Sequence, residues 1–150
     1  MRIPVLVNRR AAELESRTDE TLLEALRRAG FRSVRLTCGI GVCGACTVLM
    51  DGAPISSCLV LAPAAAGAEI TTTEGLAGDD PVALAFQEAN AFQCGYCTPG
   101  FVLTARALLS EVSNPSDDEI RHALAGNLCR CGSYVKIVNA VRLAAIAINR

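Results

Sequence analysis

The chain has 150 residues, of which 51% are hydrophobic and 19% charged, and its formal net charge of −1 excludes the strongly basic surface of a nucleic-acid-binding protein. No stretch reaches the roughly 20 apolar residues of a membrane span, and the first residues lack the apolar core of a secretory signal, so we expect a protein of the reducing cytoplasm. In that compartment the eight cysteines favour metal binding over disulfide formation.

The first half of the sequence predicts a mixed sheet. Five segments are rich in apolar and β-branched residues and predict strands: residues 2–7, 11–16, 46–50, 53–60 and 69–74. The polar turn Asn8-Arg9-Arg10 predicts that the first two strands form a hairpin, and Asp51-Gly52 is a strong turn signal between the third and fourth.

One helix is predicted within this half, in residues 18–30. Thr18 is interpreted as its N-cap, Asp19 and Glu20 as acidic residues of the first turn, and Gly30 as its terminator. We expect its leucines to lie on one face and to pack on the sheet.

From residue 79 onward the pattern predicts four helices: residues 79–90, 98–111, 116–126 and 133–148. Their N-caps are interpreted as Asp80, Thr98, Ser116 and Ser133. The last helix is expected to bury an apolar stripe through Val135, Val138, Val141 and Leu143. Residues 74–79 (EGLAGD) resemble a linker, so the sequence predicts an α+β chain of two domains, residues 1–76 and 77–150.

The first cysteine set consists of Cys38, Cys43, Cys46 and Cys58. Four, two and eleven residues separate its members, which is the plant-type spacing of a [2Fe–2S] cluster. Three glycines lie in the same loop: Gly39, Gly41 and Gly44. They permit positive φ angles and bring backbone N–H groups close to the sulfurs. The alternatives are a four-cysteine zinc site or buried core cysteines, but zinc ligands usually come as two Cys-x2–4-Cys pairs.

The second cysteine set consists of Cys94, Cys97, Cys129 and Cys131. Its members lie near the expected starts of helices, whose free N–H groups favour a negatively charged cluster. On spacing alone, two separated cysteine pairs could also hold zinc, so the metal of the second set stays open at this point.

The cysteine-bearing stretches resemble the small iron–sulfur subunits of molybdenum hydroxylases, the family of carbon monoxide dehydrogenase, xanthine dehydrogenase and aldehyde oxidoreductase. The matching stretches are CGIGVCGACTVLMDG, SCLV, FQCGYCTPGF and GNLCRCGSY, in the order and spacing of that family. The resemblance covers nearly the whole chain. It implies an N-terminal β-grasp domain like that of plant-type ferredoxins and a helical domain resembling a four-helix bundle, each with one [2Fe–2S] cluster.

The resemblance also implies partners and a direction of electron flow. The second set would bind an inner cluster near the molybdopterin of a large subunit, and the first set an outer cluster facing a medium FAD subunit. Electrons would pass from molybdenum through both clusters to flavin or another acceptor, with no substrate chemistry in this chain. A dimer of heterotrimers is the expected assembly. The alternatives are a redox carrier that works alone and a zinc-stabilised adaptor.

Several single residues near the cysteines, and the one histidine, carry expectations of their own. Gln93 matches the family glutamine that contacts the pterin, although an ordinary helix-end amide is the simpler interpretation. Thr37 stands where the family commonly has glycine, and Gly132-Ser133 replaces its usual Thr-Gly. His122 is expected on the surface. Tyr96 and Tyr134 are expected to pack beside the cysteines, where their hydroxyls can form hydrogen bonds.

The apolar surplus of the composition also bears on partners. A free ferredoxin that shuttles between partners is expected to carry a charged docking face, because charge steers transient encounters. The sequence has no such cluster of charge. A permanent subunit, whose apolar surface is covered by larger neighbours, is therefore the favoured interpretation.

Overall fold

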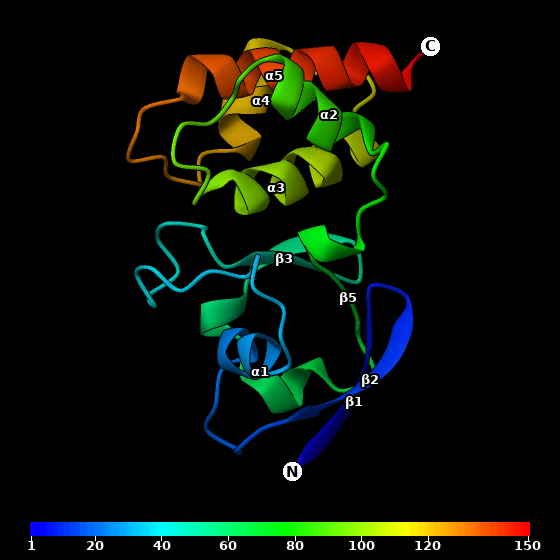
Figure 1. The fold of residues 1–150 in the computed structure, drawn as a ribbon, viewed down its shortest axis with the longest axis vertical. Helices are drawn as coiled ribbons and strands as arrows, with labels where there is room; N and C mark the ends of the chain where they lie inside the picture. The colour runs from blue at the N-terminus through cyan, green and yellow to red at the C-terminus, as the bar shows by residue number, and fades with distance from the viewer.

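The computed structural model describes all 150 residues, which form two parts (Figure 1). The five strands are β1 (Arg2–Val7), β2 (Arg10–Glu15), β3 (Thr47–Met50), β4 (Ala53–Ser56) and β5 (Glu69–Thr71). The five helices are α1 (Leu22–Arg28), α2 (Pro81–Glu88), α3 (Thr98–Glu111), α4 (Asp117–Ala123) and α5 (Tyr134–Ile148). Helix α1 lies with the strands and the other four helices form the second part, which confirms the predicted α+β class.

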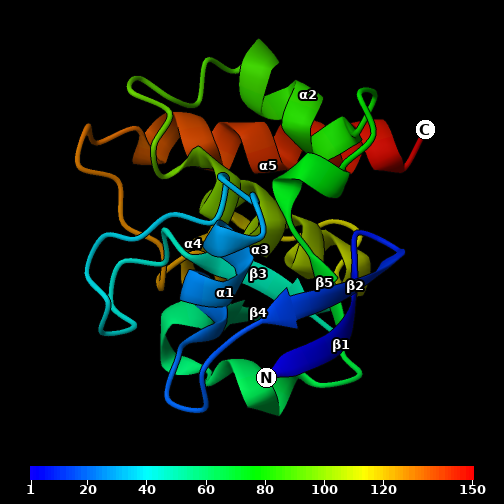
Figure 2. The same cartoon turned by 60° about the horizontal axis from the view of Figure 1, so that its bottom comes forward.

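The strands form one mixed sheet in the order β2-β1-β5-β3-β4. β1 pairs with β5 in parallel, and the other neighbouring strands are antiparallel. The predicted hairpin between β1 and β2 is confirmed, and Asn8 (φ 53°) and Arg9 (φ 65°) adopt the left-handed conformation that a two-residue turn requires. The leucines of α1 share a core with alternate residues of β1, so this helix covers one face of the sheet (Figure 2).

The start of α1 differs from the prediction. Thr21, and not Thr18, is the N-cap: its hydroxyl accepts a hydrogen bond from the N–H of Glu24, whose carboxylate accepts one from the N–H of Thr21. Thr21 is the N-cap because Glu24, three residues later, completes a capping box with it. Glu20, expected in the first turn, is buried before the helix and pairs with Arg28.

Two predicted strands are shorter in the structure. β4 ends at Ser56, and the next residues form a 3₁₀ turn that carries Cys58. In this turn the Ser57 hydroxyl donates a 2.7 Å hydrogen bond to the Cys46 carbonyl. β5 ends at Thr71. The N–H of the following Thr72 is taken by the side-chain oxygen of Asn8 at 2.8 Å, so it has no strand partner.

Two of the four predicted helix caps are confirmed in full. One carboxylate oxygen of Asp80 accepts hydrogen bonds from the N–H groups of Val82 and Ala83 at 3.1 and 3.0 Å. Ser116 and Glu119 form the capping box at the start of α4. Both caps satisfy N–H groups that a helix start leaves free.

The other two caps, at the starts of α3 and α5, are corrected. Thr98 is the first residue of α3, behind Cys97 at the N-cap, and its hydroxyl forms no hydrogen bond. Ser133 does occupy the N-cap position of α5, but its hydroxyl does not cap the helix. Both helices therefore begin without a side-chain cap, within three residues of a cysteine of the second set.

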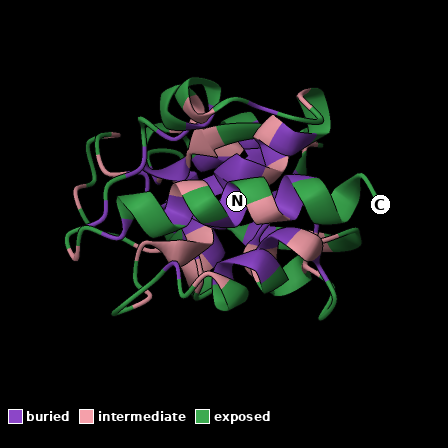
Figure 3. Ribbon diagram, turned by 90° about the horizontal axis from the view of Figure 1, so that it is seen from above, coloured by how far each residue is buried: buried purple, intermediate pink, exposed green.

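The apolar stripe predicted for helix α5 is confirmed in part: Val141 is buried, Val138 and Leu143 are partly buried against the helical core, and Val135 is exposed. The buried residues of this helix are Ile137, Ala140, Val141, Ala144 and Ala145. They recur at spacings of three and four, and Val135 lies two residues before the first of them, so it falls off this face and is 84% exposed. Figure 3 shows the resulting alternation of buried and exposed residues along the helix that leads to the C-terminus.

The buried apolar residues form two main cores, one among the strands and α1 and one among α2, α3, α4 and α5. A small third cluster of Leu49 on β3 with Leu103 and Ala107 on α3 joins the two parts. None of the helices combines the length and the apolar character that a membrane crossing requires.

Two cysteine-lined candidate metal centres

The first cysteine set lies on a loop between α1 and β3 and on the 3₁₀ turn after β4. Gly41 has φ +75°, and a Cβ built on it would lie 2.2 Å from a methyl carbon of Leu59. Gly44 has φ +69°, and its Cβ would lie 2.4 Å from the carbonyl oxygen of Gly126. At both positions the positive φ favours glycine, and the neighbouring atoms leave no space for a Cβ.

Backbone N–H groups of this loop point at cysteine sulfurs. The Cys38 sulfur accepts from the N–H of Ile40 at 3.5 Å and of Cys43 at 3.4 Å, and the Cys43 sulfur accepts from Ala45 at 3.5 Å. Such donors stabilise negative charge on sulfur. The glycine-rich loop thus brings backbone amides within 3.5 Å of two cysteine sulfurs.

The thiols of the first set lie in pairs. Amide groups, that of Ile40 first, lower the pKa of Cys38 to about 6, and the neighbouring Cys43 thiol adds to this effect. Burial raises the pKa of Cys58 to about 11, and the adjacent Cys46 thiol raises it further. Two pairs suit a core of two irons, in which each iron takes two thiolates.

The second set shows the same pairing. The amide of Tyr96 lowers the pKa of Cys94, and the Cys131 thiol contributes next. Burial raises the pKa of Cys97 to about 12, with the Cys129 thiol as the second cause. The structure thus brings together cysteines that are 32 and 37 positions apart in sequence, one from the loop before α3 and one from the loop before α5 in each pair.

Cys129 is the most enclosed member of the second set. Its burial, the largest single effect, opposes ionisation, but hydrogen bonds from the N–H of Ser133, 3.4 Å from its sulfur, and from the Cys97 thiol and other neighbouring groups together lower its pKa. The hydroxyl oxygen of Tyr134 accepts a 2.8 Å hydrogen bond from the Cys129 N–H, as expected of a tyrosine beside a cluster cysteine.

Two buried hydroxyl groups near the second set indicate whether its surroundings suit an iron–sulfur group. Thr98 Oγ1 and Ser133 Oγ are the two buried side-chain polar atoms of the chain that lack a hydrogen-bond partner. An unpaired buried hydroxyl costs about 1–3 kcal/mol. Thr98 directly follows Cys97 and the amide of Ser133 contacts the Cys129 sulfur, so both hydroxyls flank the second set. Thiolate and sulfide sulfurs are acceptors, and the residues therefore fit a sulfur-rich, anionic group.

The two cysteine loops are joined by hydrogen bonds that the sequence did not predict. The N–H of Leu128, the residue before Cys129, donates to the carbonyl oxygen of Cys43 at 2.9 Å. The buried side chain of Asn127 donates to the carbonyl of Gly44 at 3.1 Å and accepts from the Thr104 hydroxyl at 2.9 Å. Cys129 of the second set is thus separated from Cys43 of the first by one residue, Leu128, and one hydrogen bond.

A second contact between the loops uses Arg35 and Tyr96. The Arg35 guanidinium donates to the Gly95 carbonyl at 3.0 Å and lies 4.7 Å from the centre of the Tyr96 ring. The Tyr96 hydroxyl donates to the Leu36 carbonyl at 2.9 Å. Tyr96 was expected to pack beside the cysteines because it lies between Cys94 and Cys97. No feature of the sequence indicated that Arg35 would contact it.

The remaining candidates lie as follows. The Gln93 amide nitrogen is exposed and 3.5 Å from the Cys131 carbonyl oxygen, next to the second set. His122 is exposed on α4, as predicted. Gly132, with φ +79°, takes the left-handed position of the turn after Cys131, so the shifted glycine of this chain meets a conformational need.

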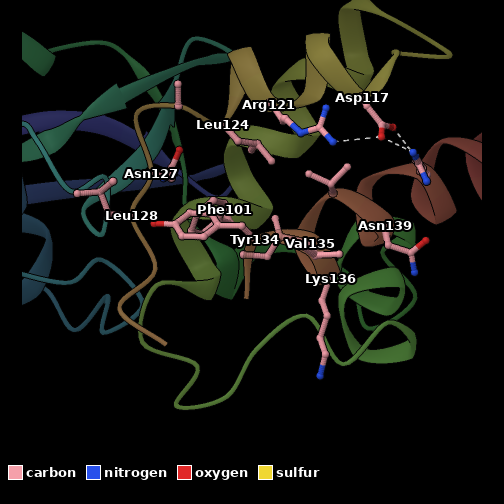
Figure 4. Close-up of a pocket in the computed structure, with 14 residues that line it drawn as sticks. Phe101, Asp117, Arg121, Leu124, Asn127, Leu128, Tyr134, Val135, Lys136 and Asn139 are labelled. Atoms are coloured by element: carbon pink, nitrogen blue, oxygen red, sulfur yellow. Dashed lines mark hydrogen bonds and ion pairs between the residues drawn. The ribbon is translucent and has the colours of Figure 1, made fainter. Parts of the chain in front are cut away.

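An apolar cleft of about 730 Å³ opens beside the second set, between α4 and α5 (Figure 4). The edge-on rings of Phe101 and Tyr134, 6.3 Å apart, line it together with Leu128 and Val135. At its far end Asp117 pairs with both Arg121 and Arg142. The cleft thus presents apolar surface next to the cysteines and a closed ion pair away from them.

Two family models match the chain. One described as "2Fe-2S iron-sulfur cluster binding domain" matches residues 5–76, and one described as "[2Fe-2S] binding domain" matches residues 72–142. Each range contains one complete cysteine set. These matches favour iron–sulfur clusters over the zinc alternative in both places.

Two similar proteins have nearly the same length. The nicotinate dehydrogenase small FeS subunit of Eubacterium barkeri is 46% identical over 142 residues, covering 92% of this chain and 90% of that protein. The xanthine dehydrogenase iron–sulfur-binding subunit of Escherichia coli O157:H7 is 44% identical over 144 residues, covering 93% and 91%.

Two solved structures share the fold. A chain of quinoline 2-oxidoreductase from Pseudomonas putida 86 aligns with a TM-score of 0.95 and 41% identity over 100% of this chain and 96% of that chain. The aldehyde oxidoreductase of Desulfovibrio desulfuricans aligns with a TM-score of 0.93 and 37% identity over 99% of this chain but only 17% of that chain. The same unit therefore occurs both as a separate chain and as part of a much longer one.

Proposed function

The chain belongs to the family of small iron–sulfur subunits of molybdenum hydroxylases, and on that premise we propose which residues hold its two clusters and how it meets its partners. Loaded with two [2Fe–2S] clusters, it is the electron-transfer subunit of an oxidoreductase and relays electrons from a molybdopterin-containing catalytic subunit to a flavin subunit or another acceptor. The substrate of the complex is bound by the catalytic subunit.

The proposed ligands of the outer cluster are Cys38, Cys43, Cys46 and Cys58, and those of the inner cluster are Cys94, Cys97, Cys129 and Cys131. The pairing of the thiols supports one further detail: Cys38 with Cys43 and Cys46 with Cys58 share an iron, and so do Cys94 with Cys131 and Cys97 with Cys129. We place the domain boundary between residues 76 and 77, which the two separate cores support.

The observation that carries the relay is the hydrogen bond from the Leu128 N–H to the Cys43 carbonyl. It links the two proposed ligand sets through the backbone: Cys129 is bonded to Leu128, and the Leu128 N–H contacts the carbonyl of Cys43. Because Asn127 and Arg35 fix the loops on either side of it, the spacing between the sets is set by this chain alone and not by the partners.

Two exposed apolar rims support two different partner surfaces. Around the first set the exposed apolar residues are Leu36, Ile40, Val42, Leu59 and Leu61, and around the second they are Phe92, Tyr96, Leu128, Tyr134 and Val135. Exposed apolar surface concentrated in this way marks interfaces. We propose that the first rim faces the flavin subunit, whereas the second, with the cleft of Figure 4, faces the catalytic subunit.

Gln93 is the proposed contact to the pterin. Its exposed amide lies beside the Cys131 carbonyl at the edge of the second rim, where it remains free to donate to a group on the partner. The full assembly is proposed as a dimer of heterotrimers in the reducing cytoplasm, and the eight unpaired cysteines support that compartment.

The test is to purify the complex through a tag on this chain and to measure its molybdenum, flavin and subunit content. We expect both cofactors to copurify with larger subunits. Val135→Glu, which places a charge on the second rim, should release molybdenum and keep flavin, and Ile40→Glu should do the reverse. Purification of the chain alone, with both clusters reducible, would instead support a carrier that works by itself.

A further inference from the structure

The Ser133 hydroxyl is buried and has no partner in a place where a partner is expected. The residue is 5% exposed, its side chain does not cap α5, and Ser133 Oγ forms no hydrogen bond within the chain. The amide nitrogen of the same residue lies 3.4 Å from the Cys129 sulfur. The hydroxyl is therefore enclosed next to one proposed ligand of the inner cluster.

The preceding glycine explains why a side chain can stand there. Gly132 takes the left-handed conformation of the turn (φ +79°), which leaves Ser133 with an ordinary φ of −73° and room for a Cβ. In the family pattern to which the chain is similar, threonine precedes glycine at these two positions. Here the order is reversed, and the reversal puts a hydroxyl where that pattern has no side chain at all.

We propose that the Ser133 hydroxyl donates a hydrogen bond to the Cys129 sulfur, or to a sulfide bound beside it, and thereby raises the reduction potential of the inner cluster. The proposal rests on the ligand assignment given above. Reduction adds one electron, supplied by the catalytic subunit or by dithionite, and the serine proton stays on its oxygen. A donor to sulfur favours the reduced, more negative form, and burial strengthens the effect.

Two nearby oxygens do not accept from the Ser133 hydroxyl. The carbonyl oxygen of Ser133 is used by the N–H of Ile137 at 2.9 Å, and the hydroxyl of Tyr134 already accepts from the Cys129 N–H. Neither pairs with the Ser133 hydroxyl. The other unpartnered hydroxyl, that of Thr98, lies in the matching stretch FQCGYCTPGF, whereas Ser133 stands where the usual family pattern has glycine.

The experiment measures the potential of each cluster in the purified complex by low-temperature EPR of samples poised at a series of potentials. Ser133→Ala and Ser133→Gly should each lower the ratio of reduced to oxidised inner cluster about tenfold at fixed potential, which corresponds to about 59 mV for one electron. The outer cluster in the same samples should not shift. Ser133→Thr, which keeps the hydroxyl, should restore the value, and the distant Ser110→Ala should have no effect.

A second measurement detects the hydrogen bond itself. In D₂O, pulsed ENDOR of the reduced inner cluster should show an exchangeable deuteron that disappears in Ser133→Ala and stays in Ser133→Thr. Unchanged potentials in both the alanine and glycine variants, or equal shifts of both clusters, would overturn the proposal. Its failure differs from failure of the ligand assignment, because the latter would remove one of the two cluster signals from the unmodified protein.

Discussion

The side-chain amide of Asn127 donates a 3.1 Å hydrogen bond to the carbonyl oxygen of Gly44, 83 residues earlier in the chain. The same nitrogen lies 3.3 Å from the Thr47 hydroxyl, and the amide oxygen accepts from Thr104. One buried side chain therefore ties the first cysteine loop, strand β3 and helix α3 to the segment that carries Cys129. It is a direct, buried contact between the segments that carry the two candidate metal centres.

Asn127→Asp tests this tie, because it keeps the shape of the side chain and replaces its donor with a second acceptor. A buried carboxylate facing the Gly44 carbonyl should cost about 2–3 kcal/mol. We expect a lower melting temperature by circular dichroism and faster hydrogen exchange at the Leu128 amide. Asn139→Asp, on the exposed side of α5, is the matched control. Equal effects of the two substitutions would contradict a tie at Asn127.

Gly44→Ala tests the close approach of the two loops. The added methyl would lie 2.4 Å from the Gly126 carbonyl oxygen, in a residue with φ +69°. Strain and overlap together should cost about 2–5 kcal/mol. Gly52→Ala has a similar φ of +84° but open space around it, so it should show only the conformational cost of about 1–2 kcal/mol. Thermal unfolding of both variants measures the difference, and its absence would show that the loops do not approach closely.

Cys43→Ser tests whether the two centres are independent. The substitution should remove the outer cluster and leave about two irons per chain, because each set of thiolates is held by its own core. Cys97→Ser should remove the inner cluster only. Iron analysis with EPR distinguishes the two losses, and disappearance of both signals in either variant would contradict the division of the chain into two domains.

Glu20→Gln tests a buried ion pair near α1. The hydrogen bond from Arg28 lowers the pKa of Glu20 to about 2, against burial that acts in the opposite direction. A lowered pKa adds stability above the unfolded value of about 4.5, and this stability is lost only as the pH falls toward 2. Between pH 5 and 8 the variant should therefore be less stable by a constant amount, about 1–2 kcal/mol. A loss that changes with pH in this window, measured by thermal unfolding, would refute the assignment.

Local signals in the sequence predicted most of the elements and both cysteine sets. The hairpin at Asn8-Arg9 and the caps at Asp80 and Ser116 depend on neighbours within a few residues, and each is confirmed. The predicted start of α1 was wrong because two threonines competed for the cap, and the capping box at Thr21 decided between them. Short-range chemistry was thus sufficient wherever a single candidate was present.

Contacts between the two parts could not be predicted. Asn127 and Arg35 donate hydrogen bonds to the backbone carbonyls of Gly44 and Gly95. Because every residue has such a carbonyl, the sequence does not indicate which one will be the acceptor. The burial of Ser133 is of the same kind: its place at a helix start predicted a cap, but the fold turned its hydroxyl away from the helix. Residues that join distant segments become visible only when the chain is folded.

The most direct test of the account is low-temperature EPR of the dithionite-reduced complex, combined with iron and acid-labile sulfide analysis. Two distinguishable S = ½ signals, with about four irons and four sulfides for each copy of this chain, are the predicted result. A protein without these signals, containing zinc in place of iron, would contradict the claim that the two cysteine sets hold [2Fe–2S] clusters.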